Sequence, residues 1–359
     1  MAETIRTVAC IGNPIADKGH GEEAYERVFQ LLAEAGEQHG FMMMDLTGSS
    51  FDESLANART LAATYDALIV VGGDGMIALG ANAVGGSGKP LGIVAVGSGN
   101  DFARGLELPV NRIDTAIEGI IGAIVRGTSI DVDMGHVTSI VDSGAGTVAV
   151  QNEQSAIDRY YAGMLSCGVD ASINNRANHS HLPNGSLRYL AAVIVELTRL
   201  EAYGYHVRAT LADGSVDERD IISPLLTVAN SRHIGGGIEV SPYSCFDDGL
   251  LDLVWLDHMP KLSELAQIVP HIYDGRLLAH PLFEWQRVRA VEITSIDGFP
   301  EPPVLMADGE YVGKLPVTVE ALGRTLRVLV PPAVAADQLR RLDEQSEVRL
   351  RRDNRRLSQ

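Results

Sequence analysis

Two short glycine-rich stretches could hold phosphate groups, because each follows an apolar run and each carries an aspartate. The first reads GGDGM at residues 72–76, and the second reads GSGND at residues 97–101. Glycine lets the backbone approach a phosphate closely, and a helix that begins after the turn adds unpaired N–H groups and a favourable dipole. In a parallel sheet both turns would lie at the carboxyl edge, where ligands bind. We therefore expect the phosphates of a nucleotide over these two turns.

Carboxylates accompany these turns. Asp74 and Asp101 lie within them, and Asp131 and Asp133 follow in the stretch SIDVDMG. Several carboxylates near a phosphate make chemical sense with a divalent cation, and Mg²⁺ prefers oxygen ligands and commonly keeps waters and substrate phosphates among them. The pattern thus predicts a magnesium-dependent phosphate site. A simpler interpretation of Asp101 alone, as the N-cap of the next helix, stays open at this point.

Two other phosphate-binding motifs fit less well. The segment GGSGKP at residues 85–90 has Pro90 where a P-loop needs Ser or Thr, and Ala83 stands where its first glycine belongs. The segment GDGMIA at residues 73–78 matches the dinucleotide fingerprint, but the following strand, LGIVAVGSG, ends without the expected acidic residue. Together with the second glycine turn, this favours ATP over a dinucleotide.

The first part of the chain must position these turns, and its pattern is that of an α/β domain. Up to residue 133, continuous apolar runs such as TVACIG and DALIVV alternate with segments whose apolar spacing suits helices. We expect these helices at about residues 22–36, 51–64 and 113–125. Apolar strands that alternate with helices indicate a parallel sheet covered on both faces.

After residue 133 the pattern changes. Short alternating runs such as HVRATL and RAVEITSI, separated by Gly, Pro, Asn and Asp, predict an antiparallel sheet or sandwich. Two helices should interrupt it, at residues 185–202 and 262–273. The tail, residues 335–359, is rich in arginine and lacks a strong apolar period after Leu342. We interpret it as a solvated helix with a frayed end, and a basic contact to lipid headgroups is the alternative.

Composition excludes several classes of partner. The chain has 359 residues and a formal net charge of −18, which argues against nucleic acid and provides no long-range attraction to an anionic membrane. Its three cysteines form no CxxC pair, so no zinc site is indicated. No apolar window approaches the ~20 residues that span a bilayer, and the first residues do not read as a signal peptide. We expect a cytoplasmic protein.

Four blocks of sequence together resemble the diacylglycerol-kinase-like lipid kinases, a family that includes bacterial lipid kinases and sphingosine kinases. They are GGDG at 72–75, LGIVAVGSGNDFARGLELP at 91–109, the long stretch at 228–256 that contains DDGLLD, and MADGE at 306–310. The blocks occur in the family's order. Alone, DGE would be interpreted as a plain β-turn, but together with the other three blocks it resembles the family's late catalytic motif.

The resemblance implies two domains. An ATP-binding, Rossmann-like α/β domain would comprise residues 1–133, with 333–359 returning to it, and a β-rich antiparallel sandwich would comprise residues 134–332 and bind lipid. The implied reaction transfers the γ-phosphate of ATP to a lipid hydroxyl of diacylglycerol type, with Mg²⁺. The implied setting is the inner face of a membrane, contacted peripherally, with a homodimer as a further expectation.

The resemblance also implies roles for individual residues. Asp308 corresponds to the general base, and the catalytic candidates are Asp308, Glu310, Asp74 and Asp101. The nucleotide-binding candidates are Asn13, Thr47, Gly72, Gly73, Asp74, Gly75, Met76, Ser98 and Asn100. Asp133 also resembles part of the acidic network that supports the catalytic cation. The metal candidates are Cys245, Asp248, Leu250 and Asp133. Of these, Cys245, Asp248 and Leu250 fall where the family holds a structural Mg²⁺, with Cys245 and Leu250 offering backbone carbonyls.

Some positions depart from the family pattern. Met76 replaces the usual threonine and removes a hydroxyl near the phosphates, and residues 13–19 lack the serine of the family's first loop and add Asp17. Two alternatives therefore stay open. One is a kinase of a soluble acceptor such as NAD, because GGDG-like turns also occur in NAD kinases and phosphofructokinases. The other is a non-catalytic nucleotide-binding relative.

Overall fold

The first part of the chain forms a parallel sheet. The computed structural model describes residues 5–13, 20–140, 156–169, 171 and 200–355. Four parallel strands lie in the order β2-β1-β3-β4. They are β1 (Thr7–Gly12), β2 (Met42–Asp45), β3 (Ala67–Gly72) and β4 (Leu91–Ala95). β3 and β4 are buried along their whole lengths, as apolar strands covered on both faces should be.

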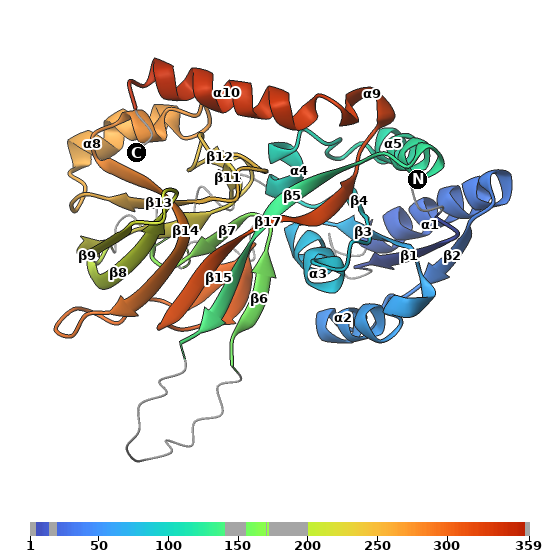
Figure 1. Cartoon of the computed structure of the whole chain (residues 1–359), viewed down its shortest axis with the longest axis horizontal. Coiled ribbons are helices and arrows are strands. Elements are labelled where there is room, and N and C mark those ends of the chain that lie inside the picture. The colour runs from blue at the N-terminus through green and yellow to red at the C-terminus, as the bar shows by residue number, and fades with distance from the viewer. Residues whose placement is uncertain (1–4, 14–19, 141–155, 170, 172–199, 356–359) are drawn as a thin grey trace, which may run out of the picture.

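Helices cover both faces of this sheet (Figure 1). α1 (His20–His39) and α5 (Ile113–Arg126) share one apolar core with the strands, and α2 (Phe51–Thr60) and α3 (Asp74–Val84) share another. A short helix, α4 (Asp101–Gly105), follows β4. The predicted α/β pattern is confirmed, and the helix predicted over 51–64 divides into α2 and a 3-10 turn, Ala62–Thr64.

The second part is an antiparallel sheet curled around its own core. Alternate residues of its strands, among them Tyr205, Val228, Leu253 and Val291, are buried together on the inner face. Its strands are β5 (Ser129–Ser139), β6 (Asp158–Tyr161), β7 (Met164–Ser166), β8 (Tyr203–Leu211), β9 (Val216–Ser223), β10 (Leu226–Ala229), β13 (Leu251–Leu256), β14 (Phe283–Ser295), β15 (Leu305–Ala307), β16 (Glu310–Gly313) and β17 (Val317–Leu329). The predicted sandwich-like second part is thus confirmed.

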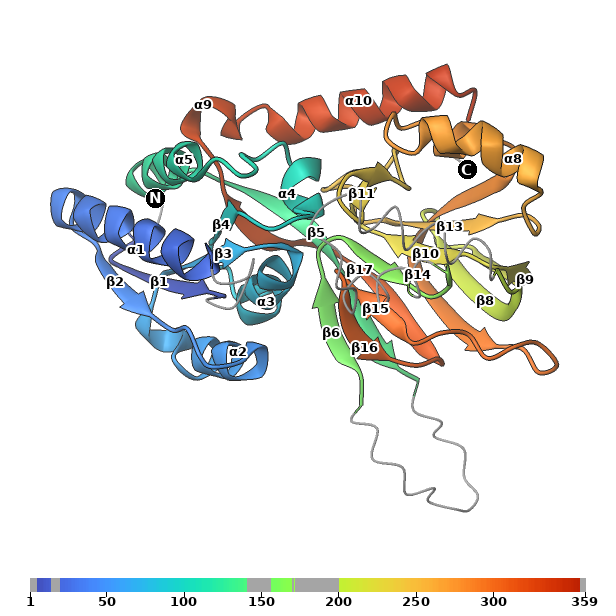
Figure 2. The same cartoon turned by 180° about the vertical axis from the view of Figure 1, so that it is seen from behind.

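Two long strands connect the two parts. β5 pairs with β17 along both strands, and Val328 of β17 lies parallel to Leu91 of β4. The sheet therefore continues from the parallel part into the antiparallel part (Figure 2). The expected boundary at residue 133 falls inside β5, so the division at residues 133 and 332 stays a proposal.

The helix predicted over residues 262–273 is shorter in the structure, where α8 comprises Leu262–Ile268. α8 ends at Ile268, and a 3-10 turn, Val269–His271, continues from it. Pro270 explains the difference, because proline lacks the N–H of an α-helical bond and its ring clashes with the preceding turn. The helix predicted over 185–202 lies outside the described residues, apart from residues 200–202, which are not helical.

The tail forms α9 (Pro332–Ala335) and α10 (Gln338–Arg352). The expectation of a solvated helix is wrong for one face of α10, where a stripe at four-residue spacing is buried: Gln338, Leu342, Ser346 and Leu350. Two of these residues are polar, which is why no apolar period was visible. Both views show α10 lying across the two parts of the molecule (Figures 1 and 2). In the ranges described, no helix has the length and apolar character to cross a bilayer.

Candidate active site

The strand order of the parallel sheet reverses between β1 and β3. The chain passes from β1 to β2 on one side and returns to β3 on the other, and ligands bind where strand order reverses in this way. Gly12 lies opposite Val71 in the register, and its N–H donates to Thr47 Oγ1 at 3.1 Å. Thr47 and the exposed Asn13 therefore lie at the same edge as Gly72. The loop that follows, residues 14–19, lies outside the described residues.

The two glycine turns touch each other. A Cβ on Gly97 would lie 2.3 Å from the Cα of Gly73, a distance that no side chain could tolerate. Gly72 has a φ of 154°, and a Cβ there would come within 2.5 Å of Met76 Cγ. The glycines thus allow the turn after β3 and the turn after β4 to lie in direct contact. Met76 is buried, with its side chain in the core beneath the turn.

Asp74 joins the two turns through its carboxylate. Its Oδ2 accepts the N–H of Asn100 at 2.7 Å, and its Oδ1 accepts the N–H of Asp101 at 2.7 Å. Asn100 adopts a left-handed conformation, with φ 59°, and its side chain bonds to both backbone groups of Gly97. Burial raises the pKa of Asp74, and the two N–H donors oppose that rise. Asp74 therefore holds the start of α4 in place.

Asp101 is not the N-cap that the simpler interpretation offered. Asn100 precedes the helix, and Asp101 is its first residue. Its carboxylate instead accepts N–H groups from Gly236 at 3.0 Å and Gly237 at 2.8 Å, more than 130 residues away. Burial, and then the charge of Asp74, raise the pKa of Asp101 to about 7, which the glycine donors oppose.

Asp308 lies in a cradle of backbone donors. Its Oδ2 accepts the N–H of Ala162 at 2.8 Å, and its Oδ1 accepts those of Gly163 at 2.7 Å and Met164 at 3.0 Å. The residue is half-buried and has a φ of 50°, at the turn between β15 and β16. Burial raises the pKa of Asp308 to about 6, the three N–H groups oppose this, and the charge of Asp74 adds to it.

The turn after β3 and the turn after β15 face each other. A Cβ on Gly75 would lie 2.6 Å from Glu310 Oε1, and the charge of Asp74 acts on Asp308. Burial raises the pKa of Glu310, and Arg159 opposes this rise. The structure therefore brings the four catalytic candidates together from both parts of the chain, with Ser98 exposed beside them.

The metal candidates gather around a different loop, at residues 245–250. Asp133 Oδ2 accepts the N–H of Gly249 at 2.6 Å, and its Oδ1 accepts that of Arg324 at 2.6 Å. The charged neighbours that act on Asp133 are Asp247 and Arg324, so it belongs with this loop. Asp248 forms an ion pair with Arg287 at 3.2 Å. Burial raises the pKa of the Cys245 thiol to about 12, which suits a backbone ligand better than a thiolate.

The donor chemistry of this loop suits a hard cation. Burial raises the pKa of Asp248 to about 7 despite Arg287, and the charges of Asp252 and Asp133 add to the rise. Such an excess of negative charge would be offset by a cation, and carboxylate and carbonyl oxygens are the ligands that Mg²⁺ takes. Among the described residues, no three His, Cys, Asp or Glu side chains form a metal-binding group by themselves. Carbonyls such as that of Leu250 and waters would have to complete the shell.

Three features of the site were not recognised in the sequence. The glycine triplet at residues 235–237 has Asp101 as its partner, and three consecutive glycines are a local sign of a close backbone approach. Asn230 is buried and donates to the carbonyls of Asp133 at 2.9 Å and Ala162 at 2.7 Å, which ties the metal loop to the cradle of Asp308. Arg287 was not recognised because its partner, Asp248, is distant in the sequence and lies in the loop at residues 245–250.

Known proteins resemble this chain over most of its length. The family model "Diacylglycerol kinase catalytic domain" matches residues 7–137, and "YegS C-terminal NAD kinase beta sandwich-like domain" matches residues 163–330. A diacylglycerol kinase of Mycobacterium tuberculosis is 26% identical over 330 residues, which are 91% of this chain and 96% of the relative. One of Staphylococcus carnosus is 26% identical over 324 residues, 89% of this chain and 94% of the relative.

A solved structure of a diacylglycerol kinase from Bacillus anthracis is also similar. It superposes with a TM-score of 0.61 at 19% identity, and the match covers 92% of this chain and 99% of that one. At this identity the likeness shows the fold alone. With both family models matched in order and the curated relatives spanned nearly end to end, the chain belongs to the diacylglycerol-kinase-like family of lipid kinases.

Proposed function

We propose that this protein transfers the γ-phosphate of ATP to the hydroxyl of a lipid of diacylglycerol type. The observation that carries the proposal is the meeting of two turns. The phosphate-binding turn around Asp74 and Gly75 faces the turn that carries Asp308 and Glu310. Phosphoryl transfer needs this arrangement, because donor phosphate and acceptor hydroxyl must be held in line at one point.

The backbone of the glycine turns would bind the phosphates of ATP. The helix α3 begins at Asp74, and the N-terminus of a helix favours a phosphate through its dipole. The adenosine would lie toward Asn13 and Thr47, at the strand-order reversal. A Mg²⁺ ion held beside Asp74 and Asp101 would neutralise phosphate charge. A second, structural Mg²⁺ could be held at the loop 245–250 by Asp133, Asp248 and the carbonyls of Cys245 and Leu250.

Asp308 would act as the general base. The lipid hydroxyl gives its proton to the Asp308 carboxylate, its oxygen forms a bond to the γ-phosphorus, and the bond from that phosphorus to the β–γ bridging oxygen breaks, leaving ADP. The cradle of Ala162, Gly163 and Met164 fixes the carboxylate, and Oδ2, which accepts only one N–H, keeps a lone pair that can take the proton. A carboxylate placed in this way typically contributes about 10²–10⁴-fold to the rate.

The test compares D308N with wild type, using ³²P-labelled ATP and diacylglycerol in mixed micelles. D308N should lose transfer by about 10²–10⁴-fold, while ATP binding measured by calorimetry stays within about twofold. D213N is the matched control, because Asp213 lies in the exposed turn between β8 and β9. Unchanged transfer in D308N contradicts its role as the base. Label that appears only in phosphorylated NAD, offered as a competing acceptor, contradicts the lipid.

A further inference from the structure

A short hairpin donates hydrogen bonds from two backbone N–H groups to the carboxylate of Asp101. It consists of β11 (His233–Ile234) and β12 (Ile238–Glu239), joined by the three glycines at 235–237. All three glycines have left-handed φ values, of 62°, 87° and 105°. This conformation points the N–H groups of Gly236 and Gly237 at the carboxylate. The position of the hairpin therefore decides whether Asp101 keeps these donors.

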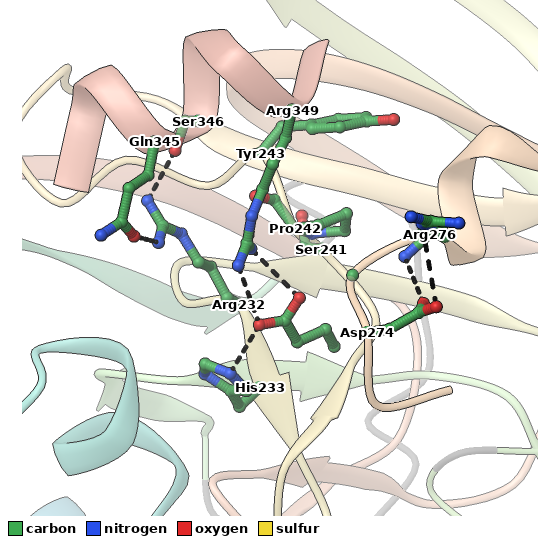
Figure 3. Close-up of polar contacts among 12 residues, drawn as sticks. Arg232, His233, Ser241, Pro242, Tyr243, Asp274, Arg276, Gln345, Ser346 and Arg349 are labelled. Atoms are coloured by element: carbon green, nitrogen blue, oxygen red, sulfur yellow. Dashed lines mark hydrogen bonds and ion pairs between the residues drawn. The ribbon is translucent and has the colours of Figure 1, made fainter. Parts of the chain in front are cut away.

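Helix α10 holds the strand that enters the hairpin. Arg232 directly precedes β11, is 3% exposed, and extends its guanidinium to α10. It donates to Gln345 Oε1 at 3.0 Å, to Ser346 Oγ at 2.7 Å and to the carbonyl of Leu342. Figure 3 shows Arg232 reaching upward from its strand to Gln345 and Ser346.

The same helix holds the strand that leaves the hairpin. Arg349 of α10 contacts both carboxylate oxygens of Glu239, at 3.1 and 3.2 Å, and Glu239 is 8% exposed. His233 Nε2, across the hairpin, lies 3.1 Å from Glu239 Oε1. Figure 3 shows Arg349 descending from the helix toward His233. This ion pair includes one hydrogen bond, from Arg349 Nη2 to Glu239 Oε1, which fixes its direction as well as its distance.

The first turns of α10 hold the other partner, the segment that follows α4. Gln338 donates to the carbonyl of Leu106, and Arg341 forms an ion pair with Glu107. Asp101 begins α4, which ends at Gly105, so these contacts lie directly after the helix that carries it. One helix thus binds both the segment after Asp101 and the hairpin that supplies its donors.

We propose that Glu239 and Arg349 are positioning residues, which hold Gly236 and Gly237 against Asp101 through the ion pair between β12 and α10. This inference rests on the proposed function, in which Asp101 acts beside the phosphates. Neither residue touches the turn that it positions. Their effect on phosphate transfer would arise because they set the position of the hairpin relative to α4. A misplacement of about 1 Å in an active site can cost about 10²-fold in rate.

Four variants separate positioning from general stability. R349Q and E239Q each remove one charge, and E239Q/R349Q removes both, so that no buried charge is left unpaired. R349K keeps the charge but loses the planar guanidinium. R340Q is the matched control, because Arg340 and Glu344 form an ion pair on the exposed face of the same helix.

The first readout is amide hydrogen exchange in peptides that cover residues 233–240. In R349Q, E239Q and the double variant, the amides of Gly236 and Gly237 should exchange at least about tenfold faster than in wild type. R340Q should not differ from wild type. This measurement needs no substrate, so it does not depend on the lipid being identified correctly.

The second readout is transfer of phosphate from ATP to diacylglycerol at a temperature where every variant is folded by circular dichroism. We expect kcat to fall by about 10- to 100-fold in R349Q and E239Q, with KM for diacylglycerol within about twofold of wild type. The double variant should be no slower than either single variant, because the residues act as one unit. R349K should recover kcat only in part, because lysine restores the charge but not the geometry of the guanidinium.

The outcomes are distinct. Wild-type exchange at Gly236 and Gly237 in R349Q overturns the inference, and so does fast exchange accompanied by a wild-type kcat. If wild-type protein transfers no phosphate to lipid, the proposed function fails. Faster exchange in R349Q than in R340Q would then still support the ion pair's hold on the turn.

Discussion

At the scale of single residues, the site concentrates acidic groups where phosphates would bind. Asp74, Asp101 and Asp308 are held by backbone N–H donors rather than by basic side chains. Such donors orient a carboxylate without neutralising its charge, so burial still raises the pKa of each group. The residues are therefore fixed in place yet remain able to take a proton or face a cation.

A pH profile should show these raised values. Asp308, with a pKa of about 6, must be unprotonated to accept the hydroxyl proton, and Asp101 has a pKa of about 7. The rate of transfer to diacylglycerol should therefore decline as pH falls through 7 and 6. The decline should be steeper than protonation of a single group would cause. Both folded-state pKa values exceed the ordinary 3.8, so protonation of these groups adds stability as pH falls, and they do not cause unfolding in this window.

The measurement is kcat/KM between pH 5 and 8, with circular dichroism at each pH to confirm the fold. A rate that stays constant down to pH 5 would contradict the raised pKa of Asp308, because a base with the ordinary pKa of 3.8 remains unprotonated at that pH.

At the scale of elements, the turns after β3 and β4 work as one unit. Asp74 of the first turn caps the helix of the second, and Gly73 contacts Gly97 directly. G97A would force the two backbones apart, since a Cβ there meets Gly73 Cα at 2.3 Å. We expect G97A to lower ATP affinity and transfer by at least about tenfold.

G122A is the control for this substitution. Gly122 lies in α5, and a Cβ there makes only an ordinary contact of 3.4 Å with Pro332. Calorimetric titration with ATP and the micelle assay check both variants. If G97A binds ATP as tightly as G122A, the close approach of the turns does not matter to the nucleotide.

The elements also show what the sequence could and could not predict. The strand–helix alternation was predictable because apolar periodicity is local, and the turns were predictable because glycine and aspartate mark them. The donors to Asp101 were not, because they lie on a hairpin more than 130 residues further along the chain. The buried face of α10 was missed because Gln338 and Ser346 read as polar although both are buried. Pairings of this kind arise only from the tertiary fold.

At the scale of the whole molecule, one continuous sheet brings the two halves of the site together. The strands β5 and β17 cross between the parts, and α10 spans them on the outside. The net charge of −18 surrounds this arrangement with a negative field. A protein of this charge would approach an anionic lipid surface against repulsion.

The field predicts an unusual dependence on salt. On vesicles that contain anionic lipid, the initial rate should rise as NaCl increases from about 0.02 to about 0.2 M, because the screening length shortens to less than about 10 Å. On vesicles of neutral lipid the rate should change less. The assay is phosphate transfer to diacylglycerol in each type of vesicle, and a rate that falls with salt on anionic vesicles would instead indicate a basic docking patch.

The most direct test of the account is to identify the product. Purified protein is incubated with ATP, Mg²⁺ and a total lipid extract, and the extract is analysed by mass spectrometry beside a D308N reaction. The account predicts one lipid class that gains a single phosphate on a hydroxyl, diacylglycerol converted to phosphatidic acid, in the wild-type reaction only. Phosphate found solely on a water-soluble acceptor, or equal product from D308N, would contradict it.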